Sequence, residues 1–173
     1  MTRIHPCSLP AGALLARYAG MGYVDCYATD MQRTVSHAEF VETFYTGSVF
    51  KLERWLLKLF AAKASTDEDA RQLAAGTRQD FSAWTVEGRA TDQLLMCDVR
   101  GRTRSWLMVS PRSEGVGTRL YFGSAVIASK RPTDSKLRLG IVFTMLLGFH
   151  KVYSKVLLSA ARARLAQSHA CES

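Results

Sequence analysis

The residues best placed to do chemistry together are His150 and Tyr153, three positions apart in a segment with helical periodicity. Side chains at this spacing share one face of an α-helix, so both can reach a single bound group. A neutral imidazole is a general base near pH 7, and a phenol can orient or protonate an oxygen. The pair therefore suits a cyclase or dehydratase, with Asp25, Glu87 or Asp98 as further polar groups. The alternative is structural: His150 hydrogen-bonds a backbone carbonyl in the core, and Tyr153 extends its hydroxyl to solvent.

Other catalytic patterns are missing from the sequence. It contains no G-x-S-x-G, G-x-x-x-x-G-K-[ST] or G-x-G-x-x-G, and the near match GVGTRL (115–120) precedes a strand-like run rather than a helix. The four histidines and four cysteines show neither C-x-x-C nor H-x-x-x-H spacing. We therefore expect no metal site and no flavin or nicotinamide cofactor.

A cluster of arginines surrounds a glycine in DVRGRTRSWLMV (98–109), directly before an apolar run. The pattern predicts a hairpin with Gly101 at its tip. Arg100 and Arg102 then lie at an exposed tip, where they either rim a pocket mouth and meet an anionic ligand head or are simply solvated. A basic finger for nucleic acid is not favoured, because the neighbouring strands account for the segment.

Two registers of this hairpin are open. A three-residue loop over 100–102 places Asp98 opposite Arg104, and it puts Met96 and Trp106 opposite each other in one aromatic–thioether patch. A two-residue Gly101–Arg102 turn suits glycine's preferred first position, but it places Val99 opposite Arg104.

Hydrophobic periodicity predicts the elements that position these residues. A strand over 23–30 precedes a helix over about 37–45 with a Ser36–Glu39 capping box, and a second capping box at Ser65–Glu68 begins a helix that ends at Gly76. Strand-like runs with short turns predict an antiparallel meander. The remaining expected elements are a helix over 48–63, strands over 80–89, 92–99, 102–111 and 117–128, and a long helix from 139 to about 167.

The long terminal helix is amphipathic. Lys151, Lys155 and Arg162 gather on one side, and an apolar stripe lies opposite. Its members are Leu139, Val142, Phe143, Leu146, Tyr153, Leu157, Ala160 and Ala161. Val152 and Val156 widen this stripe, which favours either a homodimer contact or docking on anionic lipid as a peripheral membrane protein.

This order of elements resembles the START-like (SRPBCC) superfamily of helix-grip domains, in which a curved antiparallel sheet wraps a long C-terminal helix. The runs DQLLMCDVRGRTRSWLMV, LYFGSAV and LLGFHKVYSKVLL also resemble a family of small uncharacterised bacterial proteins, over about residues 21–165. The fold class is then α+β, with two or three short helices after the first strand. We count five strands, where full helix-grip folds have six or seven.

The resemblance implies a small hydrophobic or amphipathic ligand between sheet and terminal helix, and it carries over no catalytic residue. The alternative is a structural or protein-interaction domain, with a homodimer as one form, in which the same side chains fill a closed core. The candidates are Trp84, Met96, Trp106, Met108, Tyr121, Leu146, His150 and Tyr153, although Val86 and Phe122 are also considered and opposite parities on one strand cannot both face inward.

The length, composition and net charge of the chain restrict its domain count, its location and its partners. At 173 residues, with 47% hydrophobic and 22% charged residues, the chain is expected to form one domain over 21–167. An extended lead-in over 1–20, packed by its leucines, precedes this domain, and a short tail over 168–173 follows it. The apolar run 139–149 is too short to span a bilayer, and no signal peptide is expected. Widely separated cysteines (Cys7, Cys26, Cys97 and Cys171) indicate a reduced, cytoplasmic location. The net charge of +8 permits anionic partners, but nucleic acid is not favoured.

Overall fold

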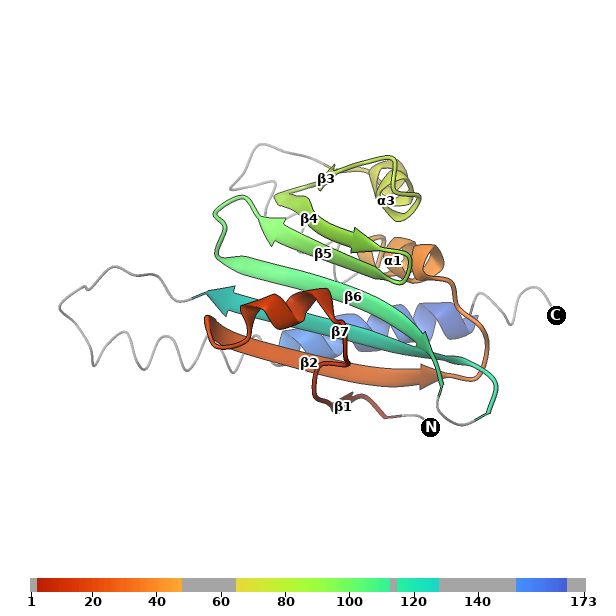
Figure 1. Ribbon diagram of the computed structural model, residues 1–173. Coiled ribbons are helices and arrows are strands. Elements are labelled where there is room, and N and C mark those ends of the chain that lie inside the picture. Colours follow the sequence, from red (N-terminus) through yellow and green to blue (C-terminus); the bar gives the residue numbers. More distant parts are fainter. Residues whose placement is uncertain (1–2, 48–64, 113–114, 128–151, 168–173) are drawn as a thin grey trace.

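The computed structural model in Figure 1 describes residues 3–47, 65–112, 115–127 and 152–167. It shows an α+β fold with one antiparallel sheet of seven strands in the order β1-β2-β7-β6-β5-β4-β3. The strands are β1 (His5–Pro6), β2 (Gly22–Met31), β3 (Asp80–Phe81), β4 (Trp84–Ala90), β5 (Gln93–Asp98), β6 (Thr103–Pro111) and β7 (Thr118–Ile127). The helices are η1 (Leu14–Tyr18, a 3₁₀ helix), α1 (His37–Tyr45), α3 (Asp67–Ala74) and a C-terminal helix over 152–167.

The strand count corrects the sequence-based expectation of five. The predicted run 80–89 is two strands, because the chain turns at Ser82, whose φ of 56° lies in the left-handed region that non-glycine residues seldom adopt. The seventh strand, β1, lies inside the predicted lead-in, and its two residues are too few to show a period. The four-strand meander and the strand before the helices are confirmed.

Helix α1 begins as the sequence predicts. Ser36 is its N-cap, and the Ser36 hydroxyl accepts the backbone N–H of Glu39 at 3.1 Å. The Glu39 carboxylate does not return the bond to Ser36. It pairs with Arg33 at 2.5 Å, so half of the expected capping box is replaced by an ion pair.

Helix α3 begins one residue later than predicted. Its N-cap is Thr66 rather than Ser65, and the reciprocal partner is Asp69 rather than Glu68. The Asp69 carboxylate accepts the Thr66 N–H at 2.7 Å and also pairs with Arg78. These two interactions favour Thr66 over the adjacent Ser65 as the N-cap. The predicted helix over 48–63 and residues 139–151 of the predicted terminal helix lie outside the described residues.

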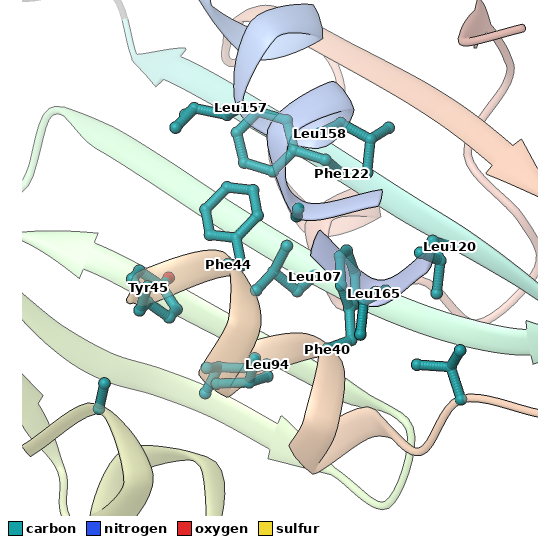
Figure 2. Close-up of a cluster of buried hydrophobic side chains, with 14 of the residues drawn as sticks. Phe40, Phe44, Tyr45, Leu94, Leu107, Leu120, Phe122, Leu157, Leu158 and Leu165 are labelled. Atoms are coloured by element: carbon teal, nitrogen blue, oxygen red, sulfur yellow. The ribbon is translucent and has the colours of Figure 1, made fainter. Parts of the chain in front are cut away.

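The sheet separates two hydrophobic cores. On one face, called here the helix face, α1 and the C-terminal helix pack across the strands (Figure 1). Figure 2 shows this core, where Phe40 and Phe44 of α1 meet Leu107, Phe122 and the leucines of the C-terminal helix. Phe44 and Phe122 stack with ring centroids 5.1 Å apart. The opposite face, called here the outer face, is covered by η1 and the chain before it.

The outer face closes around Gln93 and Gly123. The Gln93 side-chain oxygen accepts the Leu14 N–H and the Trp106 indole N–H, both at 2.9 Å, and its amide donates to the Gly12 carbonyl at 3.2 Å. A Cβ at Gly123 would lie only 2.7 Å from Leu15 Cδ2, so glycine is needed for this close approach. The lead-in therefore packs by its leucines, as predicted, but residues 14–18 form a helix rather than an extended segment.

The β5–β6 hairpin has neither predicted register. The observed pairs include Cys97 opposite Arg104 and Met96 opposite Ser105, which leaves residues 99–102 as a four-residue loop. The Asp98 carboxylate accepts the backbone N–H groups of Arg102 at 2.7 Å and Thr103 at 3.0 Å, and these bonds stabilise the longer loop. Asp98 therefore cannot pair with Arg104 as expected. The shift of one residue also places Met96 and Trp106 on opposite faces of the sheet.

Candidate functional site

Polar residues interrupt the helix face at one end of the sheet. Asp25 of β2 pairs with Ser124 of β7, Ser124 with Ser105 of β6, and Ser105 with Met96 of β5. Cross-strand partners share a face of the sheet. Phe122 lies in the helix-face core of Figure 2, and Ser124, two residues further along the same strand, therefore also lies on the helix face. Ser105 and Ser124 are buried. A row of hydroxyls and one carboxylate thus crosses an otherwise apolar surface.

Asp25 organises this polar row. Its Oδ1 accepts the Ser124 hydroxyl at 2.5 Å and the Ser124 backbone N–H at 3.1 Å, and its Oδ2 accepts the Tyr23 hydroxyl at 3.2 Å. Burial, followed by the negative charge of Asp25, raises the pKa of Tyr23 far above its usual value. The phenol therefore stays protonated at neutral pH and remains a hydrogen-bond donor. The hydroxyl protons of Tyr23 and Ser124 are donated to Asp25, so the group offers oxygen lone pairs and suits a polar partner that carries N–H or O–H donors.

A buried hydroxyl of the C-terminal helix lies toward the same end of the sheet. Arg33 donates to the Leu165 carbonyl at 2.9 Å, and the Val35 N–H donates to Thr118 at 2.8 Å, so the end of the helix lies near the start of β7. The first described turns of the helix therefore lie toward Ser124, near the other end of β7. Ser154 in these turns is fully buried, and its hydroxyl has no hydrogen-bond partner within the described part of the chain.

Apolar side chains surround the polar row. Met96 is fully buried in the helix-face core, and Trp84, Val86 and Tyr153 are partly buried against that core. Trp84 and Val86 belong to β4, which pairs with β5 beside Met96. Of the predicted ligand-binding residues, the structure therefore brings Trp84, Met96 and Tyr153 into one cluster on the helix face.

Three other predicted ligand-binding residues lie on the outer face. Trp106, Met108 and Tyr121 belong to the core covered by η1, so they are not between the sheet and the C-terminal helix. Trp106 is fully buried and bonded to Gln93, and its ring centroid lies 6.2 Å from that of Tyr121. Their sequence gives strand parity but not the face that each parity occupies, so this separation could not be read in advance.

The remaining predicted site residues are at the rim or outside the described residues. Arg100 and Arg102 are exposed at the tip of the β5–β6 hairpin. The Arg102 carbonyl accepts the N–H of Ile127, so the tip lies at the same end of the sheet as Tyr23. Their role as a pocket rim remains a prediction. Leu146 and His150 lie outside the described residues.

A groove of about 620 Å³ opens beside β2 and reaches the polar row from the sheet edge. It runs between the chain that follows β1 and the C-terminal helix, and Tyr23, Asp25 and Tyr27 contribute to its wall. The Lys155 ammonium lies 5.5 Å from the centre of the Tyr27 ring, within range of a cation–π interaction. Lys155 is thus not only part of a solvated basic face, because it also borders this groove.

Besides the polar row, sequence reasoning missed two polar arrangements. On the outer face, Glu87 accepts the Tyr18 hydroxyl and the Arg104 guanidinium, whose Nε lies 2.9 Å from the carboxylate. Glu87 stands at the irregularity between Val86 and Gly88 in the β4–β5 pairing, which strand alternation does not reveal. Arg104 thus has an acidic partner, but from β4 rather than Asp98. This group fastens η1 to the sheet.

The second polar arrangement that sequence reasoning missed is the buried imidazole of His37, at the start of α1. Its imidazole is buried, and Nε2 has no hydrogen-bond partner among the described residues. Burial and the nearby Arg89 charge lower the pKa of His37 to about 4, so the ring is neutral at pH 7. The Ser36 cap signal locates His37 at a helix start, but not its burial.

The described residues contain no group of three or more His, Cys, Asp or Glu side chains arranged to hold a metal ion. None of the helices described is long and apolar enough to cross a membrane. No protein-family model matches the chain, and no curated protein matches it.

Proposed function

We propose that the chain binds a small amphipathic molecule between the helix face of its sheet and the C-terminal helix, in the manner of a helix-grip domain. The polar part of the ligand would contact Asp25, Tyr23 and Ser154. Its apolar part would lie against Met96 and the partly buried side chains beside it. The proposal extends from the described residues toward the predicted site residues Leu146 and His150.

The observation that carries the proposal is the polar row inside an apolar interface. Burying an unpaired hydroxyl or a carboxylate costs free energy that a purely structural core avoids with apolar residues. Ser154 is fully buried and lacks a partner among the described residues, and Asp25 keeps acceptor capacity beyond its three donors. A bound polar group would supply the missing partner.

The strand order supports the helix-grip interpretation. The first long strand, β2, pairs with the last strand, β7, and the meander then runs back through β6, β5 and β4 to β3. The C-terminal helix packs across this sheet against leucines and phenylalanines of the helix face (Figure 2). An antiparallel sheet that bends around one helix leaves the space in which such domains hold ligands.

Native mass spectrometry of the purified full chain tests the proposal. We expect a co-purifying small molecule, and we expect uptake of Nile red, an apolar neutral dye, by protein from which that molecule has been extracted. A bare protein that also takes up no Nile red would overturn the proposal and favour a closed core. The same spectra report the predicted homodimer.

Two variants locate the site. Ser154→Ala is expected to weaken rebinding of the co-purifying molecule by roughly fivefold, the effect of losing one neutral hydrogen bond. Asp25→Asn is expected to weaken it by about tenfold, because a carboxylate is the stronger acceptor for a donor on that molecule. Asp30→Asn is the matched control, because Asp30 lies on the same strand but pairs with Arg119 at 2.7 Å, away from the row. Equal losses in Asp25→Asn and Asp30→Asn would place the bound molecule elsewhere.

The enzyme interpretation is a more specific form of this proposal. It needs His150 to act with Tyr153 on the bound molecule, and Tyr153 packs against the helix-face core. Under that interpretation His150→Ala abolishes turnover of the co-purified molecule and leaves its binding intact. If the molecule is retained unchanged by the unmodified protein, the chain is a binding domain rather than a cyclase or dehydratase.

A further inference from the structure

Two cysteines that are far apart in the sequence lie side by side at the edge of the sheet. Cys7 directly follows β1, and its backbone N–H donates to the Cys26 carbonyl of β2 at 3.0 Å. The two sulfur atoms are 3.2 Å apart and share a thiol–thiol hydrogen bond. Both thiols are free. The pair is created by the β1–β2 pairing, because the residues are 19 positions apart.

The two thiols differ in access. Cys7 is partly exposed and lines the groove beside β2, whereas Cys26 is only 4% exposed and packs in the outer-face core. The hydrogen bond with Cys26 lowers the pKa of Cys7 against the opposing effect of burial, and the positive charge of Arg119 adds to the lowering. The bond with Cys7, together with burial, raises the pKa of Cys26. An incoming reagent therefore meets a reactive thiol at Cys7 with a second thiol directly behind it.

We propose that Cys7 and Cys26 form a reversible dithiol site that is oxidised to an intramolecular disulfide by exchange with a small disulfide of the glutathione class. The Cys7 thiolate attacks one sulfur of that disulfide, forms a mixed disulfide and releases one thiolate. Cys26 then loses its proton, attacks the Cys7 sulfur and displaces the second thiolate. One Cys7–Cys26 bond forms, and the small disulfide is reduced to two thiols.

The backbone permits this bond. Residues that face each other as a hydrogen-bonded antiparallel pair have Cα atoms about 5.5 Å apart, which lies inside the range of about 4.4–6.8 Å for disulfides. Cys7 continues the β1–β2 register opposite Cys26, so we expect oxidation to need rotation of the two side chains rather than movement of the strands.

The disulfide would close a loop that contains η1, the cover of the outer face. Breaking the remaining contacts of this segment would no longer release it from β2, so oxidation is expected to raise the melting temperature by roughly 5–10 °C. The inference is independent of ligand binding, since it depends on the geometry of the two thiols alone.

The test uses the full-length chain incubated with oxidised glutathione and then analysed by thiol titration and peptide mapping. The expected results are the loss of two of the four cysteine thiols, a peptide pair joined through Cys7 and Cys26, and full reversal by dithiothreitol. Cys26→Ser is expected to hold glutathione on Cys7, because the second step is blocked. Cys26→Ala gives the same reading if the serine variant does not fold.

Cys97→Ser is the matched control, because this partly buried thiol bonds to the Asp98 carbonyl rather than to another thiol. It is expected to leave the Cys7–Cys26 product unchanged. The proposal is overturned if Cys7 and Cys26 stay reduced while other thiols react. It is also overturned if Cys26→Ser does not retain glutathione on Cys7.

Discussion

His37 is expected to make the stability of the protein fall steeply in mild acid. The pKa of His37 is lowered from 6.5 to about 4 in the folded protein, chiefly because the imidazole is buried and secondarily because of Arg89. A backbone hydrogen bond at Leu107 and the charge of Asp92 oppose the shift but do not cancel it.

The sign follows from comparing the two states. Above about pH 6.5 the imidazole is neutral whether the chain is folded or unfolded, so it adds no pH dependence. Between pH 6.5 and 4 His37 is protonated in the unfolded chain but stays neutral in the folded protein, so the free energy of unfolding falls as the pH is lowered. Below pH 4 both states are protonated and the loss is complete. For these two pKa values of His37, linkage gives a loss of about 2–3 kcal/mol at pH 4.5, approaching roughly 3–4 kcal/mol at lower pH.

The assay is urea unfolding of the full chain and of His37→Gln, which keeps a neutral polar side chain of similar length. The difference in unfolding free energy between the two proteins is measured at pH 7.5, 6.0, 5.0 and 4.5. It should shift by about 2–3 kcal/mol in favour of the glutamine variant over this range. Carboxylates that titrate in the same range contribute equally to both proteins and cancel.

His5→Gln is the control for losing an imidazole, because His5 is exposed in β1. A difference between wild type and His37→Gln that stays constant from pH 7.5 to 4.5 would refute the reasoning. It would mean that folded His37 is protonated as easily as in the unfolded chain, and that its burial is relieved by local opening of α1.

Two further predictions concern the outer face and use the same unfolding assay. Gly123→Ala is expected to lower the free energy of unfolding by about 1–3 kcal/mol, because the added Cβ would lie 2.9 Å from the Asp25 carbonyl oxygen. Gly88→Ala is the control and should lower it much less, because the atom nearest to its added Cβ lies 3.5 Å away. Gln93→Met is expected to lower the free energy of unfolding by about 2–4 kcal/mol, because it leaves the Trp106 indole N–H, the Leu14 N–H and the Gly12 carbonyl unpaired. A loss below about 0.5 kcal/mol would show that these groups find other partners.

How much could be read from the sequence depends on the range of the interactions. The start of α1 at Ser36 and the meander strands follow from local capping and alternation, and both were predicted. The hairpin register was not, because the Asp98 carboxylate selects a four-residue loop by bonding two backbone N–H groups. The observed register differs by one residue from the register predicted with the three-residue loop, so Trp106 and Met96 lie on opposite faces of the sheet. The predicted ligand-binding residues are therefore divided between the two faces.

The polar row was harder to predict, because it exists only when β2 lies beside β7. Asp25 and Ser124 are 99 positions apart, and each looks ordinary in its own strand. One signal was present: Ser105 and Ser124 occupy the same strand parity as Leu107 and Phe122, so each places a hydroxyl where the strand pattern requires an apolar side chain. Polar residues at core-parity positions of two strands are therefore a sequence signal for this polar row.

The same reasoning makes stability and ligand binding separable at Ser154. Its buried hydroxyl lacks a partner among the described residues, so Ser154→Ala should raise the unfolding free energy of ligand-free protein by about 1 kcal/mol or more. Alanine also favours helix by about 0.5 kcal/mol, and Ser159→Ala, at an exposed position of the same helix, measures that contribution alone. A residue that lowers stability while improving binding is what a functional site requires, whereas a residue of a closed core has no reason to do so. If Ser154→Ala is no more stable than Ser159→Ala, the hydroxyl has a structural partner, and the polar row belongs to the core rather than to a ligand.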